Sequence, residues 1–284
     1  MAGASGATLH ASSTSRPILF ASDRAGNYDL YRMSTDGSSV EPLTRTRLPE
    51  QNPAWSPSGD EIAYALGARH SDVWVARADG SHARDLTPGT PSGDRFPAWS
   101  PSGRQIVFDS DRTGYGDLYI VSAAGGRPRR LTRLRALEFY PSWSPDGRRI
   151  AFVTNFGGNL DIYTIRPNGR GLQRLTTDRG FDLFPSWSPD GKRIAFASSR
   201  DIPGGRISEI YVMDANGTHA RRLTHNQVDD WLPSWSPDGH RIVFTRNVGG
   251  HNNEIFVMDA DGRHQQRLTN NPANDVSPVW RPRY

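Results

Sequence analysis

One short pattern recurs along the chain at a nearly fixed interval and limits what the chain can fold into. Five copies keep the form Pro-x-Trp-Ser-Pro-x-Gly, and a degraded sixth copy ends the chain at 278–284. The tryptophans of the six copies are spaced by 44, 44, 44, 48 and 45 residues and are Trp55, Trp99, Trp143, Trp187, Trp235 and Trp280. Such a period is typical of repeat folds, in which each repeat is one small unit that packs on its neighbours.

Each repeat contains four short strand-like segments separated by turn residues. In the copy around Trp187 these segments are Phe184–Ser188, Arg193–Ala197, Glu209–Met213 and Ala220–Thr224. A Ser-Pro-Asp-Gly turn follows the first segment, and an Asn-Gly pair before the fourth predicts a tight type I′ hairpin. No long apolar stripe with a helical period occurs, so we expect few helices.

Four antiparallel strands in a repeat of about 40–45 residues predict one blade of a β-propeller. Residues 18–44 supply three strands and residues 277–284 supply one, so the two ends together complete a blade. We therefore expect an all-β fold, a six-bladed β-propeller of four-stranded antiparallel blades closed by a blade shared between the N- and C-termini. The closing strand, Val279–Pro282, should pair near Ile18. Residues 1–16 are expected to be a flexible tail, and 17–284 the propeller.

Composition narrows the possible functions. The chain has no cysteine, which excludes disulfides and thiolate metal sites. Its net charge of +4 comes almost entirely from arginine, with Lys192 the sole lysine, and we expect no specific nucleic-acid partner. No apolar run approaches the ~18 residues of a membrane span, so we expect no membrane insertion. We also expect a monomer. The first sixteen residues lack the apolar core of a signal peptide, which leaves a cytoplasmic protein or a mature exported form as alternatives.

The conserved order of motifs within the repeats resembles a known family. Pro-x-Trp-Ser-Pro-Asp-Gly-(Lys/Arg)-x-Ile-Ala-Phe is followed by (Asp/Glu)-Ile-Tyr-Val-Met-Asp-x-x-Gly and then by Arg-Arg-Leu-Thr. This order is similar to the repeat of TolB-type β-propellers, and it also occurs in the propellers of tricorn-like and prolyl-oligopeptidase-like peptidases. The resemblance covers about residues 17–284. It implies six blades, a periplasmic or otherwise exported location, and a protein partner such as a cell-envelope lipoprotein. The α/β domain of TolB and a Gly-x-Ser-x-Gly nucleophile motif have no counterpart in this sequence.

An acidic residue stands three positions before the strand-opening proline of every repeat. The six acids are Glu50, Asp94, Glu138, Asp182, Asp230 and Asp275. On a propeller they lie around one mouth of the central channel. They form an acidic ring that attracts cations or basic partner groups, or each accepts hydrogen bonds from loop amides or a nearby arginine and fixes its own loop. Repetition in every blade favours the structural interpretation, because a binding site usually breaks symmetry.

A group of aromatic residues in the same segments does break the symmetry. It consists of Phe139, Tyr140, Phe181, Phe184 and Trp231, where other repeats have Gln51, Asn52, Val276 and Ser277. An uneven aromatic patch on one rim is typical of a protein- or peptide-binding surface. The alternative is that these rings fill the channel or pack on loops. The predicted partner-binding residues are Glu138, Phe139, Tyr140, Asp182, Phe184, Asp230 and Trp231.

The sequence predicts no catalytic residue, no metal site and no cofactor. His82, His219 and His264 follow the tight turns of three different repeats, so they should lie far apart. The favoured function is a non-enzymatic scaffold that holds a protein or peptide over one mouth of the channel. The alternatives are a lyase or hydrolase with its active site in that mouth, or the propeller of a larger peptidase-like protein. A cluster of histidine and carboxylate groups at the mouth would favour an enzyme, and a broad aromatic rim a binding protein.

Overall fold

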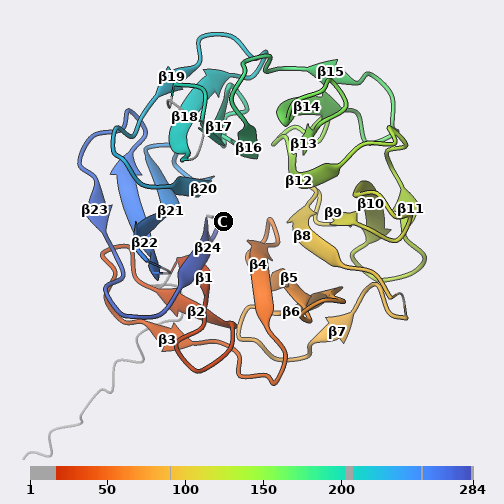
Figure 1. Ribbon diagram of the computed structural model, residues 1–284. Helices are drawn as coiled ribbons and strands as arrows, with labels where there is room; N and C mark the ends of the chain where they lie inside the picture. Colours follow the sequence, from red (N-terminus) through yellow and green to blue (C-terminus); the bar gives the residue numbers. More distant parts are fainter. Residues whose placement is uncertain (1–16, 90, 202–206, 251, 283–284) are drawn as a thin grey trace, which may run out of the picture.

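Six four-stranded antiparallel sheets surround a central channel (Figure 1). The computed structural model describes residues 17–89, 91–201, 207–250 and 252–282, and contains no helix among them. No helix long and apolar enough to cross a membrane therefore occurs in these ranges. The predicted all-β, six-bladed fold is confirmed. The predicted flexible tail 1–16 lies outside the described residues.

The strands of each blade run from the channel outward. The innermost strands are β4 (Glu50–Trp55), β8 (Asp94–Trp99), β12 (Glu138–Trp143), β16 (Asp182–Trp187), β20 (Asp230–Trp235) and β24 (Asp275–Trp280). The second strands are β5 (Glu61–Leu66), β9 (Gln105–Ser110), β13 (Ile150–Thr154), β17 (Arg193–Ser198), β21 (Arg241–Gly249) and β1 (Ile18–Ser22). The third strands are β6 (Asp72–Arg77), β10 (Asp117–Ser122), β14 (Asp161–Ile165), β18 (Glu209–Asp214), β22 (Asn252–Asp259) and β2 (Asp29–Met33). The outermost strands have two residues each and are β7 (Arg84–Asp85), β11 (Arg129–Arg130), β15 (Gln173–Arg174), β19 (Arg221–Arg222), β23 (Gln266–Arg267) and β3 (Glu41–Pro42).

Blade 1 is built from both ends of the chain, in the order β24-β1-β2-β3, and β4–β7 to β20–β23 form blades 2 to 6 in sequence order. Ile18 pairs with Trp280 and Leu19 with Val279. The predicted pairing of the closing strand with the strand near Ile18 is therefore confirmed, although that strand runs from Asp275 to Trp280. Because β24 occupies the inner edge of β1, no long edge is left open in this blade.

The core lies between neighbouring blades, and the repeat tryptophans are part of it. Trp235 is 6% exposed and packs with Phe244 and Ile210. Its indole N–H donates to the Ser186 carbonyl of the preceding blade at 3.2 Å. The Arg193 guanidinium carbon lies 4.9 Å from the centre of the Trp235 rings. Each such tryptophan thus joins two blades, which explains its recurrence at every repeat.

The predicted type I′ geometry of the hairpins between the third and fourth strands is wrong. In the Asn216-Gly217 pair only the glycine has a positive φ, of 92°, and its N–H donates to the Asp214 carbonyl at 2.9 Å. This arrangement is a type I turn followed by a glycine in the left-handed region. Packing between blades also requires the glycine, because a Cβ on Gly217 would stand 2.4 Å from the Leu175 carbonyl oxygen.

Candidate functional site

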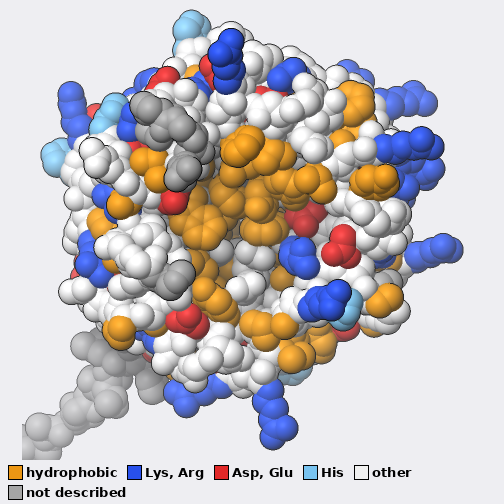
Figure 2. All heavy atoms as spheres, viewed as in Figure 1, with side chains coloured by type: hydrophobic (Ala, Val, Ile, Leu, Met, Phe, Trp, Pro, Cys, Tyr) orange, Lys and Arg blue, Asp and Glu red, His pale blue; other side chains and the backbone are white. Residues whose placement is uncertain are grey.

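The antiparallel order of the strands places three kinds of segment on one face of the ring. These are the beginnings of the inner strands, the connections between second and third strands, and the connections from each outer strand to the next blade. We call this side the mouth face. Figure 2 looks onto it and shows hydrophobic side chains gathered at its centre, over the inner ends of the blades. The basic side chains in this view lie mostly at the periphery.

A backbone irregularity recurs at the third residue of every inner strand. The register with the second strand shifts there, and the residue has a φ of 51° to 57°. The six residues each precede a proline and are Asn52, Phe96, Tyr140, Phe184, Leu232 and Ser277. Such a bulge, in which two residues oppose one, re-aims a side chain. Together with the prolines that follow, these residues line a channel cavity of about 190 Å³.

The bulge brings aromatic rings from four blades into one group, which we call the central aromatic cluster. The ring centres of Phe96 and Tyr140 are 4.4 Å apart, those of Tyr140 and Phe184 4.1 Å, and those of Phe184 and Trp231 5.7 Å. Phe139 meets Tyr140 edge-on at 4.6 Å. Each separation is within or close to the 4.5–7 Å range of favourable ring pairs. Although these residues are far apart in the sequence, they form one continuous apolar surface.

The structure thus joins four of the five aromatic residues singled out in the sequence and adds one. Phe181 is outside the cluster, with 48% of its surface exposed. Phe96 belongs to the cluster but was missed by the sequence analysis. Its signal was its position directly before Pro97, which matches the positions of Tyr140 and Phe184 before their own prolines.

Further apolar side chains extend the central aromatic cluster toward the rim. Tyr115, Leu137, Phe156 and Phe181 are all exposed and lie in mouth-face loops of blades 3 to 5. Of the seven large hydrophobic residues exposed within the described ranges, only Val40 is in a hairpin of the opposite face. Apolar patches of this extent on a soluble protein commonly mark an interaction site.

The six acids at the starts of the inner strands are buried, with no exposed surface at all. The four aspartates pair with arginines that lie late in the second strand or just after it: Asp94 with Arg112 at 2.6 Å, Asp182 with Arg200 at 2.9 Å, Asp230 with Arg246 at 2.6 Å, and Asp275 with Arg24 at 2.8 Å. These arginines also stack on aromatic residues of the second and third strands. Each of the four aspartates is therefore held by an arginine inside the protein and fixes its own loop. Because all six acids are buried, they do not form an acidic ring open to solvent.

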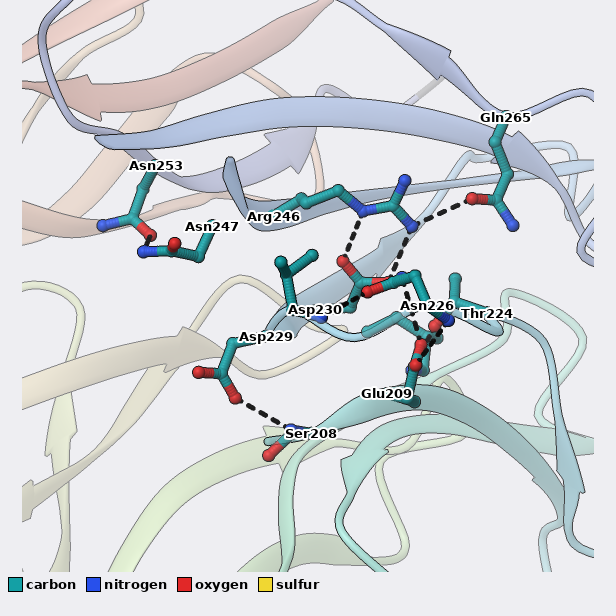
Figure 3. A network of polar contacts seen from close by, with 12 residues as sticks. Ser208, Glu209, Thr224, Asn226, Asp229, Asp230, Arg246, Asn247, Asn253 and Gln265 are labelled. Carbon is teal, nitrogen blue, oxygen red and sulfur yellow. Dashed lines mark hydrogen bonds and ion pairs between the residues drawn. The ribbon is translucent and has the colours of Figure 1, made fainter. Parts of the chain in front are cut away.

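The polar contacts around Asp230 link blade 6 to the preceding blade 5 (Figure 3). Arg246 donates two hydrogen bonds to the Asp230 carboxylate, at 2.6 and 2.7 Å. The Asn226 amide nitrogen donates both to Asp230 at 2.7 Å and to Glu209 of blade 5 at 3.2 Å. Asp230 is thus fully engaged inside the protein. The predicted partner-binding role of Asp182 and Asp230 is corrected accordingly, since both are buried and paired with arginine.

Glu50 and Glu138 occupy the same position as these aspartates but have no arginine partner in the described part of the chain. Burial raises the pKa of Glu50 to about 7, and the nearby Asp29 charge raises it further. The Thr44 hydroxyl, which donates a hydrogen bond to Glu50, lowers this pKa. Burial also raises the pKa of Glu138 to about 7, opposed by the Thr132 hydroxyl and increased by Asp117. Neither Glu138 oxygen has a hydrogen-bond partner of normal geometry among the described residues.

These two glutamates predict that stability falls as pH rises through neutrality. Between about pH 4.5 and 7 the unfolded chain is ionised at these positions while the folded chain still holds the protons, so raising the pH favours unfolding. We expect the Glu50→Gln, Glu138→Gln double variant to lose less stability than the parent between pH 5 and pH 8, because glutamine resembles the neutral acid. Urea unfolding followed by circular dichroism at both pH values measures this. Equal losses in the two proteins would contradict the prediction.

Among the described histidines, His70 and His225 are exposed in mouth-face connections of different blades and do not form a cluster. His82, His219 and His264 are exposed and lie in hairpins of the opposite face. His219 and His264 contact Asp214 and Asp259 at 2.7 and 2.6 Å. Within the described residues, no three side chains of His, Cys, Asp or Glu are placed to hold a metal ion together.

Two protein families match parts of the chain. Residues 46–137 match the TolB beta propeller domain, and residues 113–214 match the tricorn protease N-terminal beta propeller domain. The fold is thus a six-bladed β-propeller, and residues 46–137 of it carry the match to the TolB propeller repeat. The recognition of this repeat type from the sequence motifs is confirmed. A comparison with curated proteins finds no match.

Solved structures share the fold of this propeller. TolB from Acinetobacter baumannii is 24% identical with a TM-score of 0.80, over 96% of this chain and 68% of that one. A putative TolB from Agrobacterium tumefaciens is 23% identical with a TM-score of 0.72, over 89% of this chain and 88% of that one. An oligogalacturonate lyase in complex with manganese is 15% identical with a TM-score of 0.62, over 88% of this chain and 72% of that one. At these identities the likeness concerns the fold alone.

Proposed function

We propose that this TolB-type propeller is a non-enzymatic binding protein that holds a protein or peptide over the mouth of its channel. The observation that carries the proposal is the central aromatic cluster, in which rings of four blades make one continuous surface. The fold does not require an aromatic residue at the position of Tyr140, because blades 2 and 1 have Asn52 and Ser277 there in the same backbone conformation. The aromatic choice in blades 3 to 5 thus points to contact with a partner.

The distribution of apolar surface sets the footprint of the partner. The central aromatic cluster and the exposed Tyr115, Leu137, Phe156 and Phe181 lie on the same side of the mouth, over blades 3 to 6. Large rings supply most of the binding energy in protein interfaces, and nearby exposed groups exclude water from them. We therefore expect the partner to cover an area over these blades, to one side of the channel axis. A broad aromatic rim, with the hairpin histidines on the opposite face, supports a binding protein rather than an enzyme.

The resemblance to TolB suggests the class of partner and the compartment. We propose an exported protein whose partner is another protein of the cell envelope. A photo-reactive residue at Phe181, which is exposed and outside the central aromatic cluster, would capture a partner from an envelope fraction for identification by mass spectrometry.

Changing Tyr140 and Trp231 to alanine tests the site with the captured partner. We expect the double variant to bind at least about 2 kcal/mol more weakly, which corresponds to roughly thirtyfold, because both rings belong to the centre of the proposed interface. Isothermal titration calorimetry measures the affinity, and circular dichroism confirms the fold. The matched control is Val40→Ala, which removes apolar surface from the opposite face and should leave binding unchanged.

Two results would overturn this site. If the double variant unfolds, the rings are structural and their role is packing. If it stays folded and binds as tightly as the parent, the partner docks elsewhere on the propeller.

A further inference from the structure

Asp109 breaks the sixfold pattern inside the sheet of blade 3. It lies in β9 and pairs with Leu118 of β10. The residues at the same place in the register of the other second strands are Ala21, Ala65, Val153, Ala197 and Thr245. A carboxyl group therefore stands where the fold elsewhere uses a small, mostly apolar side chain. It is 7% exposed. Its neighbour across the strand is Arg95, and no other blade has an arginine and an acid at this pair of positions. An ionisable group buried in the sheet of one blade alone is a candidate for function.

Asp109 lines a pocket of about 210 Å³ at the junction of blades 3 and 4, on the mouth face. The other lining side chains include Glu138 and three rings of the central aromatic cluster, Phe96, Phe139 and Tyr140. We call this space the blade 3/4 pocket. It combines two buried carboxyl groups, and the half-exposed Asp111, with an aromatic wall. Phe96 and Tyr140 stand between it and the channel cavity lined by the six prolines, because they line both.

The two acids of the blade 3/4 pocket have unused capacity for hydrogen bonds. One Asp109 oxygen accepts a long bond of 3.3 Å from the Tyr140 backbone N–H. Glu138 is completely buried, and neither of its oxygens has a partner of normal geometry in the described part of the chain. Buried carboxyl groups are ordinarily satisfied by several donors. Burial raises the pKa of Asp109 to about 8 and that of Glu138 to about 7, so both would gain by acquiring a cationic donor.

The nearest cation does not supply these donors. The Arg95 side chain is 42% exposed and lies at the rim of the pocket, 4.0 Å from Asp111. One of its terminal nitrogens donates to the Arg69 carbonyl at 3.5 Å. Its charge lowers the pKa of Asp109, while burial, Asp94 and Asp111 raise it. Asp117 and Arg130 act on Glu138 in opposite directions. Acidic groups therefore outnumber basic ones around the pocket.

We infer that the blade 3/4 pocket binds an alkyl guanidinium group, with Asp109 and Glu138 as acceptors and Phe96, Phe139 and Tyr140 as the surrounding aromatic wall. A guanidinium is planar and weakly hydrated, presents several donors in a fixed fork, and stacks on aromatic faces. These properties match two buried acceptors beside rings better than the compact, strongly hydrated ammonium of lysine does. The inference deepens the proposed function and rests on it, because Phe139 and Tyr140 belong to both sites.

Two sources can supply this group, an arginine side chain of the docked partner or a free small guanidine. Their shared chemistry is tested with three small compounds: N-acetyl-arginine methylamide, agmatine, and N-acetyl-citrulline methylamide. Citrulline has nearly the shape of arginine without the charge. Protein-observed NMR at pH 7.5 gives the dissociation constant of each compound.

We expect N-acetyl-arginine methylamide to bind at least about tenfold more tightly than the citrulline compound, since hydrogen bonds to charged groups are worth more than neutral ones. Asp109→Ala should remove this preference. That variant places in blade 3 the residue which blades 1, 2 and 5 already have, so it should fold. Glu138→Gln should weaken arginine binding, and Arg95→Ala should strengthen it by removing a competing cation from the rim.

Binding of agmatine alone, with the same dependence on Asp109, would assign the pocket to a free guanidine. Equal affinity for the arginine and citrulline compounds, or full arginine binding by a folded Asp109→Ala variant, would overturn the inference. The affinity of the Tyr140 and Trp231 double variant for the protein partner is a separate measurement. A pocket that does not bind guanidinium and a surface that does not bind the partner therefore give different results.

Discussion

Deleting residues 277–284 should severely destabilise the propeller. The deletion removes Val279 and Trp280, which pair with Leu19 and Ile18, and leaves half of the inner edge of β1 without a partner. It also takes away a core tryptophan that is 7% exposed and packs with Phe20 and Val243 of two blades. Loss of one buried tryptophan typically costs ~3–5 kcal/mol, and a whole domain is stable by only about 5–15 kcal/mol. We expect a greatly lowered melting temperature or aggregation.

Thermal unfolding by circular dichroism and size-exclusion chromatography measure this effect. Removal of residues 1–16, which precede β1, is the matched control for shortening the chain and should leave the melting temperature unchanged. A synthetic peptide with the sequence of residues 275–284 should restore stability to the truncated protein by taking the place of β24. A truncated protein that melts at the parent temperature would show that the ring does not depend on the shared blade.

Replacing Trp235 by alanine should destabilise the propeller by ~3–5 kcal/mol, the usual range for a buried tryptophan. Trp235 fills the junction of blades 5 and 6, donates its indole N–H to the Ser186 carbonyl at 3.2 Å, and has the Arg193 guanidinium stacked on its rings. Alanine would leave a cavity between the two blades and an arginine without its aromatic surface. Urea unfolding followed by circular dichroism gives the change in the free energy of unfolding.

The repeat itself offers a control for Trp235. Trp187 occupies the same position in blade 5 and donates the same bond, to the Ser142 carbonyl at 3.2 Å, but it is only half-buried. The arginine that could stack on it, Arg149, instead donates to the Thr164 hydroxyl at 3.1 Å. Trp187→Ala should therefore cost clearly less than Trp235→Ala. Equal costs would show that burial and stacking are not what distinguishes the two positions.

Local chemistry explains why so much of the fold was predictable. The period of the tryptophans determines the number of blades, and the Ser-Pro-(Ser/Asp)-Gly turns determine where the first two strands of blades 2 to 6 meet. The incomplete repeats at the two ends have only one way to become a whole blade. Each of these features depends on residues near one another in the chain, or on the requirement that every strand edge find a partner.

Contacts between blades explain the prediction that failed. The hairpin at Gly217 is a type I turn with a left-handed glycine, and not a type I′ turn. The glycine must pass within van der Waals contact of the Leu175 carbonyl of the preceding blade. An Asn-Gly pair is compatible with both turns, so the contact with the preceding blade, and not the pair itself, selects the turn type.

The sequence by itself determined the all-β architecture, the six blades and the shared closing blade, because a repeated local pattern allows few ways of packing. Only the tertiary structure decided which side chains form a site. The positive φ before each proline brings Phe96, Tyr140 and Phe184 together, although 44 residues separate each from the next. Ring closure likewise buries the six acids. It also places Glu138 and Asp109 around one pocket, with no arginine paired to Glu138 among the described residues. Burial and pairing of this kind depend on neighbours from other blades, and these neighbours are defined only once the ring has closed.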